Sequence, residues 1–251
     1  MKSLEGKVAV VAGGARDIGR ACSEALAAQG AKVVASYYEN EEDGTATVAA
    51  IEAAGGEAIA VGGDLTTQED VDKLIAAATE AYGGKIDILV NVVGGLGARK
   101  TLAEVEVDWF EFLIRLNLTS VFMLTKAAVP HMGEGGSIVN FASQAGRDGG
   151  GPGAWVYATG KGAIQTMTRG LAKELGPSGI RINCVCPGMI ATKFHDDFTK
   201  DEVRKNVAAA TPLRREGKAS EVADLVTYLA SPASSFLTGT SVDINGGTYF
   251  S

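Results

Sequence analysis

Residues 7–19 read K-V-A-V-V-A-G-G-A-R-D-I-G, a short apolar run that leads into a glycine-rich turn. The run Lys7–Val11 has the length and composition of a buried strand, and the pattern after the turn predicts a helix that closes at Gly30. A second apolar run, Lys32–Ser36, follows directly. Strand, glycine turn, helix and strand together predict a βαβ unit, in which N–H groups at the helix N-terminus are available to a phosphate.

The same alternation continues along the chain, with no linker or low-complexity stretch. It predicts an α/β fold: a single doubly wound parallel sheet of the Rossmann type, with helices on both faces. We expect one dinucleotide-binding domain over residues 1–251, with a polar segment at about 189–217 that covers the substrate. Further strands are expected at Ala58–Val61, Ile86–Val90, Ser137–Phe141, Arg181–Val185 and Ser241–Ile244, and helices at Thr45–Ala54, Glu69–Tyr82, Val107–Met132, Trp155–Leu175 and Ser220–Leu229.

Composition narrows the classes of partner. The 251 residues carry a net charge of −7, which argues against a nucleic-acid partner, because such a partner calls for a basic surface. Cys22, Cys184 and Cys186 match neither a disulfide framework nor a usual zinc site, so we expect buried free thiols and no metal. The N-terminus M-K-S-L-E-G-K lacks the apolar region of a signal peptide, and no window approaches the roughly 20 apolar residues of a membrane span. We expect a soluble cytoplasmic protein that does not bind membranes.

A second stretch, residues 143–161, carries side chains suited to proton transfer: S-Q-A-G-R-D-G-G-G-P-G-A-W-V-Y-A-T-G-K. Tyr157 and Lys161 are four residues apart, so on a helix they share one face. A phenol with a pKa of about 10 is a poor acid or base near neutrality, but a neighbouring ammonium favours the phenolate and lowers that pKa. Ser143 can then hold a carbonyl oxygen in place. Taken alone, Y-x-x-x-K is more typical of an ordinary pair on a helix surface.

Together these motifs resemble the short-chain dehydrogenase/reductase (SDR) family, over essentially the whole chain. The resemblance is carried by the glycine turn, Asp64, Asn91–Gly94, Asn117, Ser143, Tyr157, Lys161, Pro187-Gly188 with Thr192, and the C-terminal L-T-G-T-S-V-D-I-N-G-G. It implies an NAD(P)-dependent oxidoreductase that acts on CH–OH groups and the corresponding carbonyls, with the hydride chemistry supplied by the dinucleotide. It further implies that Tyr157 protonates the carbonyl oxygen, that Ser143 hydrogen-bonds this oxygen, and that Lys161 tunes the tyrosine and contacts the nicotinamide ribose. Asn117 would hold a water in the proton relay.

The resemblance also implies the contacts to the dinucleotide. Asp64 would meet the adenine amino group, Asn91 and Gly94 would line the adenosine side, and Ile190 and Thr192 would bind the carboxamide. The full expected set is Gly13, Arg16, Asp17, Ile18, Gly19, Tyr37, Tyr38, Asp64, Leu65, Asn91, Gly94, Tyr157, Lys161, Pro187, Gly188, Ile190 and Thr192.

Two motifs depart from the family pattern. The first is usually T-G-x-x-x-G-x-G, and here Ala12 replaces the threonine and Asp17 the middle glycine. A carboxylate beside a pyrophosphate is unfavourable unless it points away, and Asp17 could instead serve as the N-cap of the first helix. The family's N-N-A-G has become Asn91-Val92-Val93-Gly94, which keeps the polar first position.

The sequence favours NADH over NADPH. No aspartate stands at the usual end of the second strand, and Arg16 occupies a position where NADP-using members often carry a basic residue. However, Tyr37, Tyr38 and four acids between Glu39 and Asp43 crowd the place where a 2′-phosphate would sit. Repulsion of a dianion by these carboxylates should outweigh one arginine. The alternative interpretation of the acids is the start of a solvated helix.

Basic residues near the expected pocket favour an anionic carbonyl substrate. Arg99 and Lys100, in G-G-L-G-A-R-K, are expected substrate contacts together with Ser143 and Gly150, since arginine presents a planar fork suited to a carboxylate. With D-G-G-G-P-G and T-K-F-H-D-D-F, this motif is similar to a subgroup that reduces the alginate-derived 4-deoxy-L-erythro-5-hexoseulose uronate to 2-keto-3-deoxy-gluconate. A solvated loop is the alternative for Arg99 and Lys100.

Three other functions stay open on the sequence. A 3-oxoacyl-[acyl-carrier-protein] reductase would need a basic surface for its acidic carrier, to which Arg214-Arg215 and Lys200–Lys205 could contribute. A glucose-type polyol dehydrogenase is a further enzyme. A non-catalytic dinucleotide sensor belongs to a different class, and the intact serine, tyrosine and lysine argue against it. The family usually assembles as homotetramers, and the apolar run Val121–Val129 is compatible with burial at such a contact.

Overall fold

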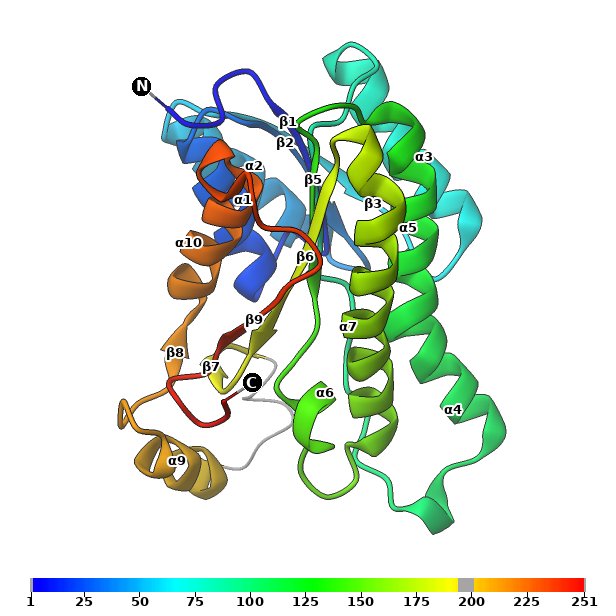
Figure 1. The fold of residues 1–251 in the computed structure, drawn as a ribbon, viewed down its shortest axis with the longest axis vertical. Coiled ribbons are helices and arrows are strands. Elements are labelled where there is room, and N and C mark those ends of the chain that lie inside the picture. Colours follow the sequence, from blue (N-terminus) through cyan, green and yellow to red (C-terminus); the bar gives the residue numbers. More distant parts are fainter. Residues whose placement is uncertain (1, 194–200, 251) are drawn as a thin grey trace.

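The structure is a computed structural model that describes residues 2–193 and 201–250 (Figure 1). Within these residues, seven parallel strands form one sheet in the order β3-β2-β1-β4-β5-β6-β9, which confirms the predicted fold class. The strands are β1 (Val8–Ala12), β2 (Lys32–Tyr37), β3 (Glu57–Gly62), β4 (Ile88–Asn91), β5 (Ser137–Phe141), β6 (Arg181–Pro187) and β9 (Ser241–Ile244). Strand order reverses at β1, between β2 and β4, and ligands of such sheets bind at this point, beyond the carboxyl ends of the strands.

The central strands are apolar on both faces because helices cover the sheet on both sides. Every residue of β1, β4 and β5 is buried. Successive side chains of β1 enter two different cores, Ala9 and Val11 on one face, Val10 and Ala12 on the other. Continuous burial thus explains why these strands read as unbroken apolar runs rather than as alternating patterns.

Helices form a layer on each side of the sheet (Figure 1). On one side lie α1 (Asp17–Ala28), α2 (Glu41–Ala53) and α10 (Ala219–Ala230). On the other lie α3 (Gln68–Tyr82), α5 (Ser120–Ala128) and α7 (Trp155–Leu175). Each layer supplies its own half of the core, through residues such as Leu26 and Val226 on the first side and Leu74 and Leu124 on the second.

The predicted helical stretch 107–132 is one run of several pieces. It consists of α4 (Val107–Ile114), a π turn (Arg115–Thr119), α5 and a short 3₁₀ turn that ends at His131. By length and composition Val107–His131 is apolar enough to cross a membrane, so the expectation that no window approaches a span is wrong by this measure. A helix packed in the core of a protein passes the same test, and Val121, Leu124 and Ala128 of this run are fully buried.

Helix α2 begins at Glu41, four residues before the predicted Thr45. The Asn40 side chain accepts a hydrogen bond from the Glu42 N–H, and three acids in the first turn suit the positive end of the helix dipole. The acids at 41–43 therefore form a helix start, which was the alternative interpretation of this run. The other departures are shifts of one or two residues at the ends of elements, such as β4, which begins at Ile88 rather than Ile86, and short elements that carry no periodic signal.

The segment between β6 and α10 folds back on itself. Strand β7 (Ile190–Ala191) pairs in parallel with β8 (Gly217–Lys218), and α9 (Asp201–Ala210) lies between them in the chain. The segment belongs to the region expected at 189–217 to cover the substrate. Residues 194–198 of the T-K-F-H-D-D-F motif, together with Lys200, lie outside the described residues.

Candidate active site

The serine, tyrosine and lysine of the second motif meet beyond the end of β5. Ser143 follows this strand by two residues, and Tyr157 and Lys161 lie in the first two turns of α7, whose bounds are those predicted. Tyr157 is hydrogen-bonded to Ser143. The Lys161 Nζ lies 5.8 Å from the centre of the Tyr157 ring and donates a 2.9 Å hydrogen bond to the Phe141 carbonyl. The three groups thus form one cluster.

Burial favours the neutral forms of both titratable groups in this cluster. It lowers the pKa of the fully enclosed Lys161 to about 8. It also raises the pKa of Tyr157, and the hydrogen bond from Ser143 opposes that shift only in part. The expectation that Lys161 lowers the pKa of Tyr157 is therefore wrong for this structure, because the ammonium bonds the Phe141 carbonyl and burial dominates. A phenol kept protonated at neutral pH is suited to donate a proton to a carbonyl oxygen.

Helix α6 (Ala145–Asp148) is fastened to the last strand of the sheet. Its Arg147 Nε lies 2.9 Å from Asp243 Oδ1, and its Nη2 donates to the Ser241 carbonyl at 3.1 Å. Both partners of the ion pair are largely buried, with 15% and 14% of their side chains exposed. Ser143 lies two residues before the start of α6, and its Oγ accepts the N–H of Ala145, the first residue of this helix, at 3.1 Å. The ion pair therefore positions the serine, and it commits Arg147 to a structural role.

Asn117 is fully buried in the π turn and holds the loop that follows β4. Its Oδ1 accepts the Gly95 N–H at 3.0 Å, and its Nδ2 donates to the Gly95 and Leu113 carbonyls at 2.9 and 3.0 Å. The side chain is thus engaged by protein groups. That Asn117 also holds a water stays a prediction.

Gly94 lies between this asparagine and the lysine. Its φ of +151° and its position leave no room for a side chain, since a Cβ there would come within 2.6 Å of Asn117 Oδ1 and 2.7 Å of Lys161 Nζ. The glycine is exposed. It therefore leaves a space beside Lys161 that a ligand can fill, near the carboxyl ends of β1 and β4.

The turn after β1 has the close backbone approach that a pyrophosphate site needs. A Cβ on Gly19 would lie 1.8 Å from the Gly13 carbonyl oxygen, and one on Gly13 would lie 3.3 Å from Val93 N. The Gly13 N–H donates to Ser36 Oγ at 2.8 Å, which ties the turn to β2. Gly13, Gly19 and the start of α1 with Ile18 therefore fit a dinucleotide pyrophosphate, with the exposed Arg16 beside them.

The predicted capping role of Asp17 is wrong. Arg16 is the N-cap residue of α1, without a capping hydrogen bond, and Asp17 is the first residue of the helix with a positive φ of 50°. Its Oδ1 accepts the main-chain N–H of Lys193 at 3.0 Å. The carboxylate therefore points to the segment that follows β7.

Asn91 is also placed differently from the expectation. It is fully buried, and its Nδ2 donates to Asn140 Oδ1 at 2.8 Å, inside the sheet. The side chain cannot line an adenosine site, so any contact there falls to its main chain and to Gly94. Sequence position could not reveal this, because the residue ends a strand whose last side chain points inward.

At the carboxamide side, the expected residues lie where β6 passes into β7. The Gly188 N–H, directly after Pro187, donates to the Ile244 carbonyl at 3.0 Å. Ile190 is buried, and Thr192 Oγ1 donates to its carbonyl at 3.2 Å. These contacts hold the segment in one conformation next to the last strand.

At the adenosine side, the ring of Tyr37 packs against two glycines. A Cβ on Gly44 or Gly62 would come within 2.6 or 2.7 Å of this ring. Tyr38 is 64% exposed, and the charges of Asp64 and Glu39 raise its pKa.

Asp64 itself is engaged locally, since its Oδ1 accepts from the Thr66 N–H and hydroxyl at 2.9 and 2.8 Å. Leu65 beside it is buried. This end of the site is therefore both aromatic and acidic.

The two basic residues expected to bind substrate join two loops. Arg99 Nη1 donates to the Pro152 carbonyl and the Lys100 N–H donates to the Gly153 carbonyl, both at 3.0 Å. The Lys100 Nζ also lies 4.4 Å from the centre of the Trp109 ring. The loop 149–153, which includes Gly150 with a φ of +73°, leads directly into α7. Both basic residues therefore lie beside the loop that precedes Tyr157.

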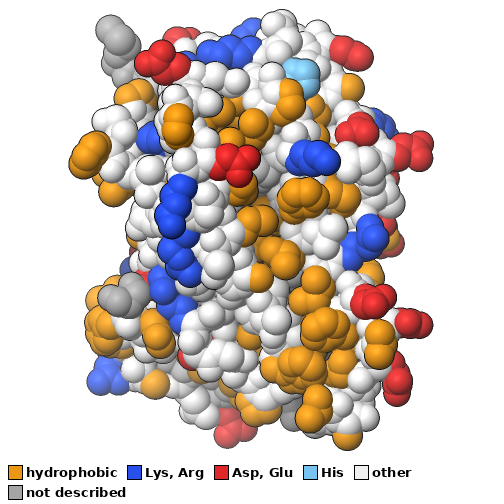
Figure 2. Space-filling model, turned by 45° about the vertical axis from the view of Figure 1, so that its right-hand side comes forward, with side chains coloured by type: hydrophobic (Ala, Val, Ile, Leu, Met, Phe, Trp, Pro, Cys, Tyr) orange, Lys and Arg blue, Asp and Glu red, His pale blue; other side chains and the backbone are white. Residues whose placement is uncertain are grey.

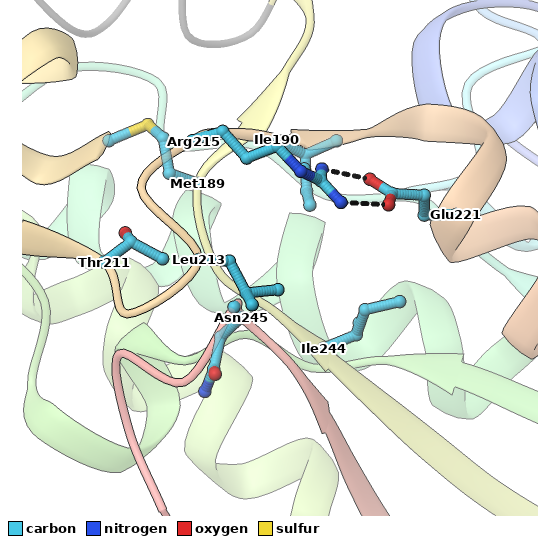
Figure 3. Close-up of a pocket in the computed structure, with 10 residues that line it drawn as sticks. Met189, Ile190, Thr211, Leu213, Arg215, Glu221, Ile244 and Asn245 are labelled. Carbon is cyan, nitrogen blue, oxygen red and sulfur yellow. Dashed lines mark hydrogen bonds and ion pairs between the residues drawn. The ribbon is translucent and has the colours of Figure 1, made fainter. Parts of the chain in front are cut away.

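A small cavity of about 110 Å³ lies between β7 and the last strand (Figure 3). It is lined mainly by Met189, Ile190, Leu213, Ile244 and Asn245. At its side, the Arg215 guanidinium makes two bonds of 2.8 and 2.6 Å to Glu221. No motif in the sequence pointed to this cavity, because its walls come from separate segments.

Comparison with curated proteins identifies relatives along the whole chain. A family model described as Enoyl-(Acyl carrier protein) reductase matches residues 13–249. An uncharacterized oxidoreductase of Methylorubrum extorquens is 38% identical over 249 residues, which cover 98% of this chain and 99% of that protein. The 3-oxoacyl-[acyl-carrier-protein] reductase of Synechocystis is 38% identical over 250 residues, which cover 98% of each.

Solved structures give the same result. A short-chain dehydrogenase/reductase from Serratia marcescens is 33% identical, with a TM-score of 0.92 and 98% of each chain covered. The NADH-dependent reductase A1-R′, responsible for alginate metabolism, is 30% identical, with a TM-score of 0.91 over the whole of both chains. A blue fluorescent protein from a metagenomic library, in complex with NADPH, is 35% identical, with a TM-score of 0.92 and 99% and 100% covered. The chain therefore belongs to the short-chain dehydrogenase/reductase family and is an NAD(P)-dependent oxidoreductase.

Proposed function

We propose that the protein is an NADH-preferring carbonyl reductase for a small anionic keto acid or sugar acid. The best candidate reaction is the reduction of 4-deoxy-L-erythro-5-hexoseulose uronate to 2-keto-3-deoxy-gluconate in alginate catabolism. The observation that carries the proposal is the cluster of Ser143, Tyr157 and Lys161, which lies beside the space left by Gly94. The basic residues Arg99 and Lys100 lie next to the loop that precedes the tyrosine.

The side chains of the cluster have separate tasks in this reaction. When bound, the dinucleotide supplies the hydride. Ser143 holds the substrate carbonyl oxygen by a hydrogen bond, and Tyr157, whose pKa burial keeps high, donates its proton to that oxygen. Lys161 lies close enough to stabilise the resulting phenolate, since its Nζ is 5.8 Å from the ring centre. With a pKa of about 8, the ammonium is largely protonated at pH 7. Lys161 and Thr192 would hold the nicotinamide half.

The adenosine side supports the preference for NADH. Glu39 and Asp64 lie close to Tyr38 there, since the charges of both carboxylates raise the pKa of this tyrosine. A 2′-phosphate would bring a second anion to these two carboxylates, against one exposed arginine at position 16. One structural neighbour is NADH-dependent and another is in complex with NADPH, so the family accommodates both dinucleotides.

The alternative enzyme is a 3-oxoacyl-[acyl-carrier-protein] reductase, which the similarity to the Synechocystis protein favours. Two of the basic residues that would receive an acidic carrier argue against it. Arg215 is paired with Glu221, and Arg204 with Glu216 at 2.7 Å. Their charges are thus compensated within the chain. A non-catalytic dinucleotide sensor has no such feature in its favour.

We further propose that the chain forms one domain, acts in the cytoplasm and assembles as a homotetramer. The assembly is supported by apolar side chains that stay on the surface of the long helical run. Phe112 is 46% and Phe122 49% exposed, and only 44% of the most apolar window of this run is buried. Figure 2 turns the side of the molecule with α4, α5 and α7 forward and shows hydrophobic side chains along it.

The decisive experiment measures initial rates of NADH and NADPH oxidation with the keto-uronate and with an acetoacetyl thioester. We expect the highest kcat/KM for NADH with the keto-uronate. The variant Tyr157→Phe serves as the control, because it should lose turnover while still binding the dinucleotide. A preference for NADPH with the thioester would contradict both the cofactor and the substrate assignment, and would favour the acyl reductase.

A further inference from the structure

Asp17 has a left-handed backbone conformation, which is uncommon for a residue other than glycine. Among the described residues, it and Arg214 are the only non-glycine residues with a positive φ, 50° and 59° respectively. A left-handed backbone is unfavourable for a residue with a Cβ and persists only where the surroundings fix it. At Asp17, therefore, a contact is expected that compensates for the conformation.

The contact is the hydrogen bond from the Lys193 N–H to Asp17 Oδ1, 3.0 Å long, which links residues 176 positions apart in the chain. Among the described residues, no ion pair involves this carboxylate. Lys193 follows Thr192, whose hydroxyl bonds the Ile190 carbonyl in β7. The carboxylate thus joins the turn after β1 to the chain just beyond β7.

We propose that Asp17 is a positioning residue that holds Thr192 and Lys193 against the glycine turn. In this way it fixes the position of the nicotinamide side of the site relative to the pyrophosphate side. The inference rests on the proposed dinucleotide-dependent function and deepens it. The same carboxylate lies in the turn that would bind the pyrophosphate, so its charge weakens binding of the phosphates. Asp17 therefore strengthens the binding of a dinucleotide through positioning and weakens it through its charge.

The two effects can be separated with a ligand that lacks nicotinamide. ADP-ribose carries the pyrophosphate but not the nicotinamide ring, so it reports only the charge effect, whereas NADH reports both. The quantity to follow is the ratio of the Kd for ADP-ribose to the Kd for NADH, measured by titration calorimetry. Asp17→Gly removes the acceptor and the charge, and glycine suits a φ of 50°. Asp17→Asn removes the charge but keeps a side-chain oxygen and tolerates the left-handed backbone.

For Asp17→Gly we expect the ratio to fall by about fivefold, the factor that one partly exposed hydrogen bond contributes. For Asp17→Asn it should stay within about twofold of the wild type, while ADP-ribose binds more tightly to both variants. Thermal unfolding of both variants checks that each is folded.

An unchanged ratio in Asp17→Gly would overturn the inference alone, as would an equal fall in both variants. If the wild type bound neither ligand, the proposed function would be overturned and the inference with it.

Discussion

Substituting Gly94 by alanine tests whether the space beside Lys161 is required for activity. The new Cβ would lie 2.6 Å from Asn117 Oδ1 and 2.7 Å from Lys161 Nζ, well inside van der Waals contact. Neither partner can withdraw freely, because Asn117 is fully buried and Lys161 is held by the Phe141 carbonyl. We therefore expect the lysine to leave its bond, and the backbone at a φ of +151° to become strained.

Two contributions set the magnitude. Loss of a charge-assisted hydrogen bond costs about 1.5–3 kcal/mol, which corresponds to a fall of about 10- to 150-fold in kcat/KM. Backbone strain of about 1–3 kcal/mol should lower the melting temperature by roughly 2–12 °C in a chain of this size. The neighbouring Gly95 provides a matched control. A Cβ there would meet only Leu116 Cδ2, at an ordinary 3.5 Å.

The assay compares kcat/KM for carbonyl-dependent NADH oxidation, together with thermal unfolding, in Gly94→Ala and Gly95→Ala. We expect Gly95→Ala to stay within about threefold of the wild type, since no contact is lost. Equal activity of the two variants would refute the reasoning, because it would mean that the lysine does not need its present position.

Two further predictions concern pH. Because burial lowers the pKa of Lys161 to about 8, kcat/KM for reduction should fall as pH rises through about 8. In Lys161→Arg this fall should move to higher pH, since a guanidinium stays protonated. A pH profile that does not move in this variant would contradict the assignment of the fall to Lys161. Burial alone would raise the pKa of Asp87, but hydrogen bonds from Lys85, the Val8 N–H and Lys7 outweigh it and lower the pKa. The folded-state pKa of Asp87 is thus below the unfolded value near 4, so its stabilising contribution is present above pH 4 and is lost as pH falls. Asp87→Asn should therefore lower the free energy of unfolding by about 1–2 kcal/mol at pH 7, since both lysines are partly exposed, and by much less at pH 3; a gap in urea unfolding that does not narrow would count against this assignment.

The regular elements of the fold could be predicted because each helix produces a periodic pattern and each buried strand an unbroken apolar run. The helix Trp155–Leu175 and the strand Ser241–Ile244 have the predicted bounds. The start of α2 was placed four residues late, because one asparagine side chain decides it. The π turn and the pair β7 and β8 were not expected, since elements this short leave no period to read.

Within the site, proximity could be predicted but orientation and protonation could not. Spacing and resemblance brought Ser143, Tyr157 and Lys161 together as the structure has them. The inward direction of Asn91 and the left-handed backbone of Asp17 depend on contacts with residues 49 and 176 positions away. The pKa of Tyr157 depends on how much protein surrounds it, a property of the whole fold that no local motif encodes.

The ion pair between Arg147 and Asp243 has a consequence for the newly synthesised chain. The helix after Ser143 is fastened to Asp243, which follows Arg147 by 96 residues, so a growing chain cannot complete its serine site until the strand Ser241–Ile244 has been synthesised. Until then β6 has no partner on that side, and Cys184 and Cys186 lie on an open sheet edge. A ribosome that stalls before residue 241 would therefore release an inactive chain with an exposed, aggregation-prone edge.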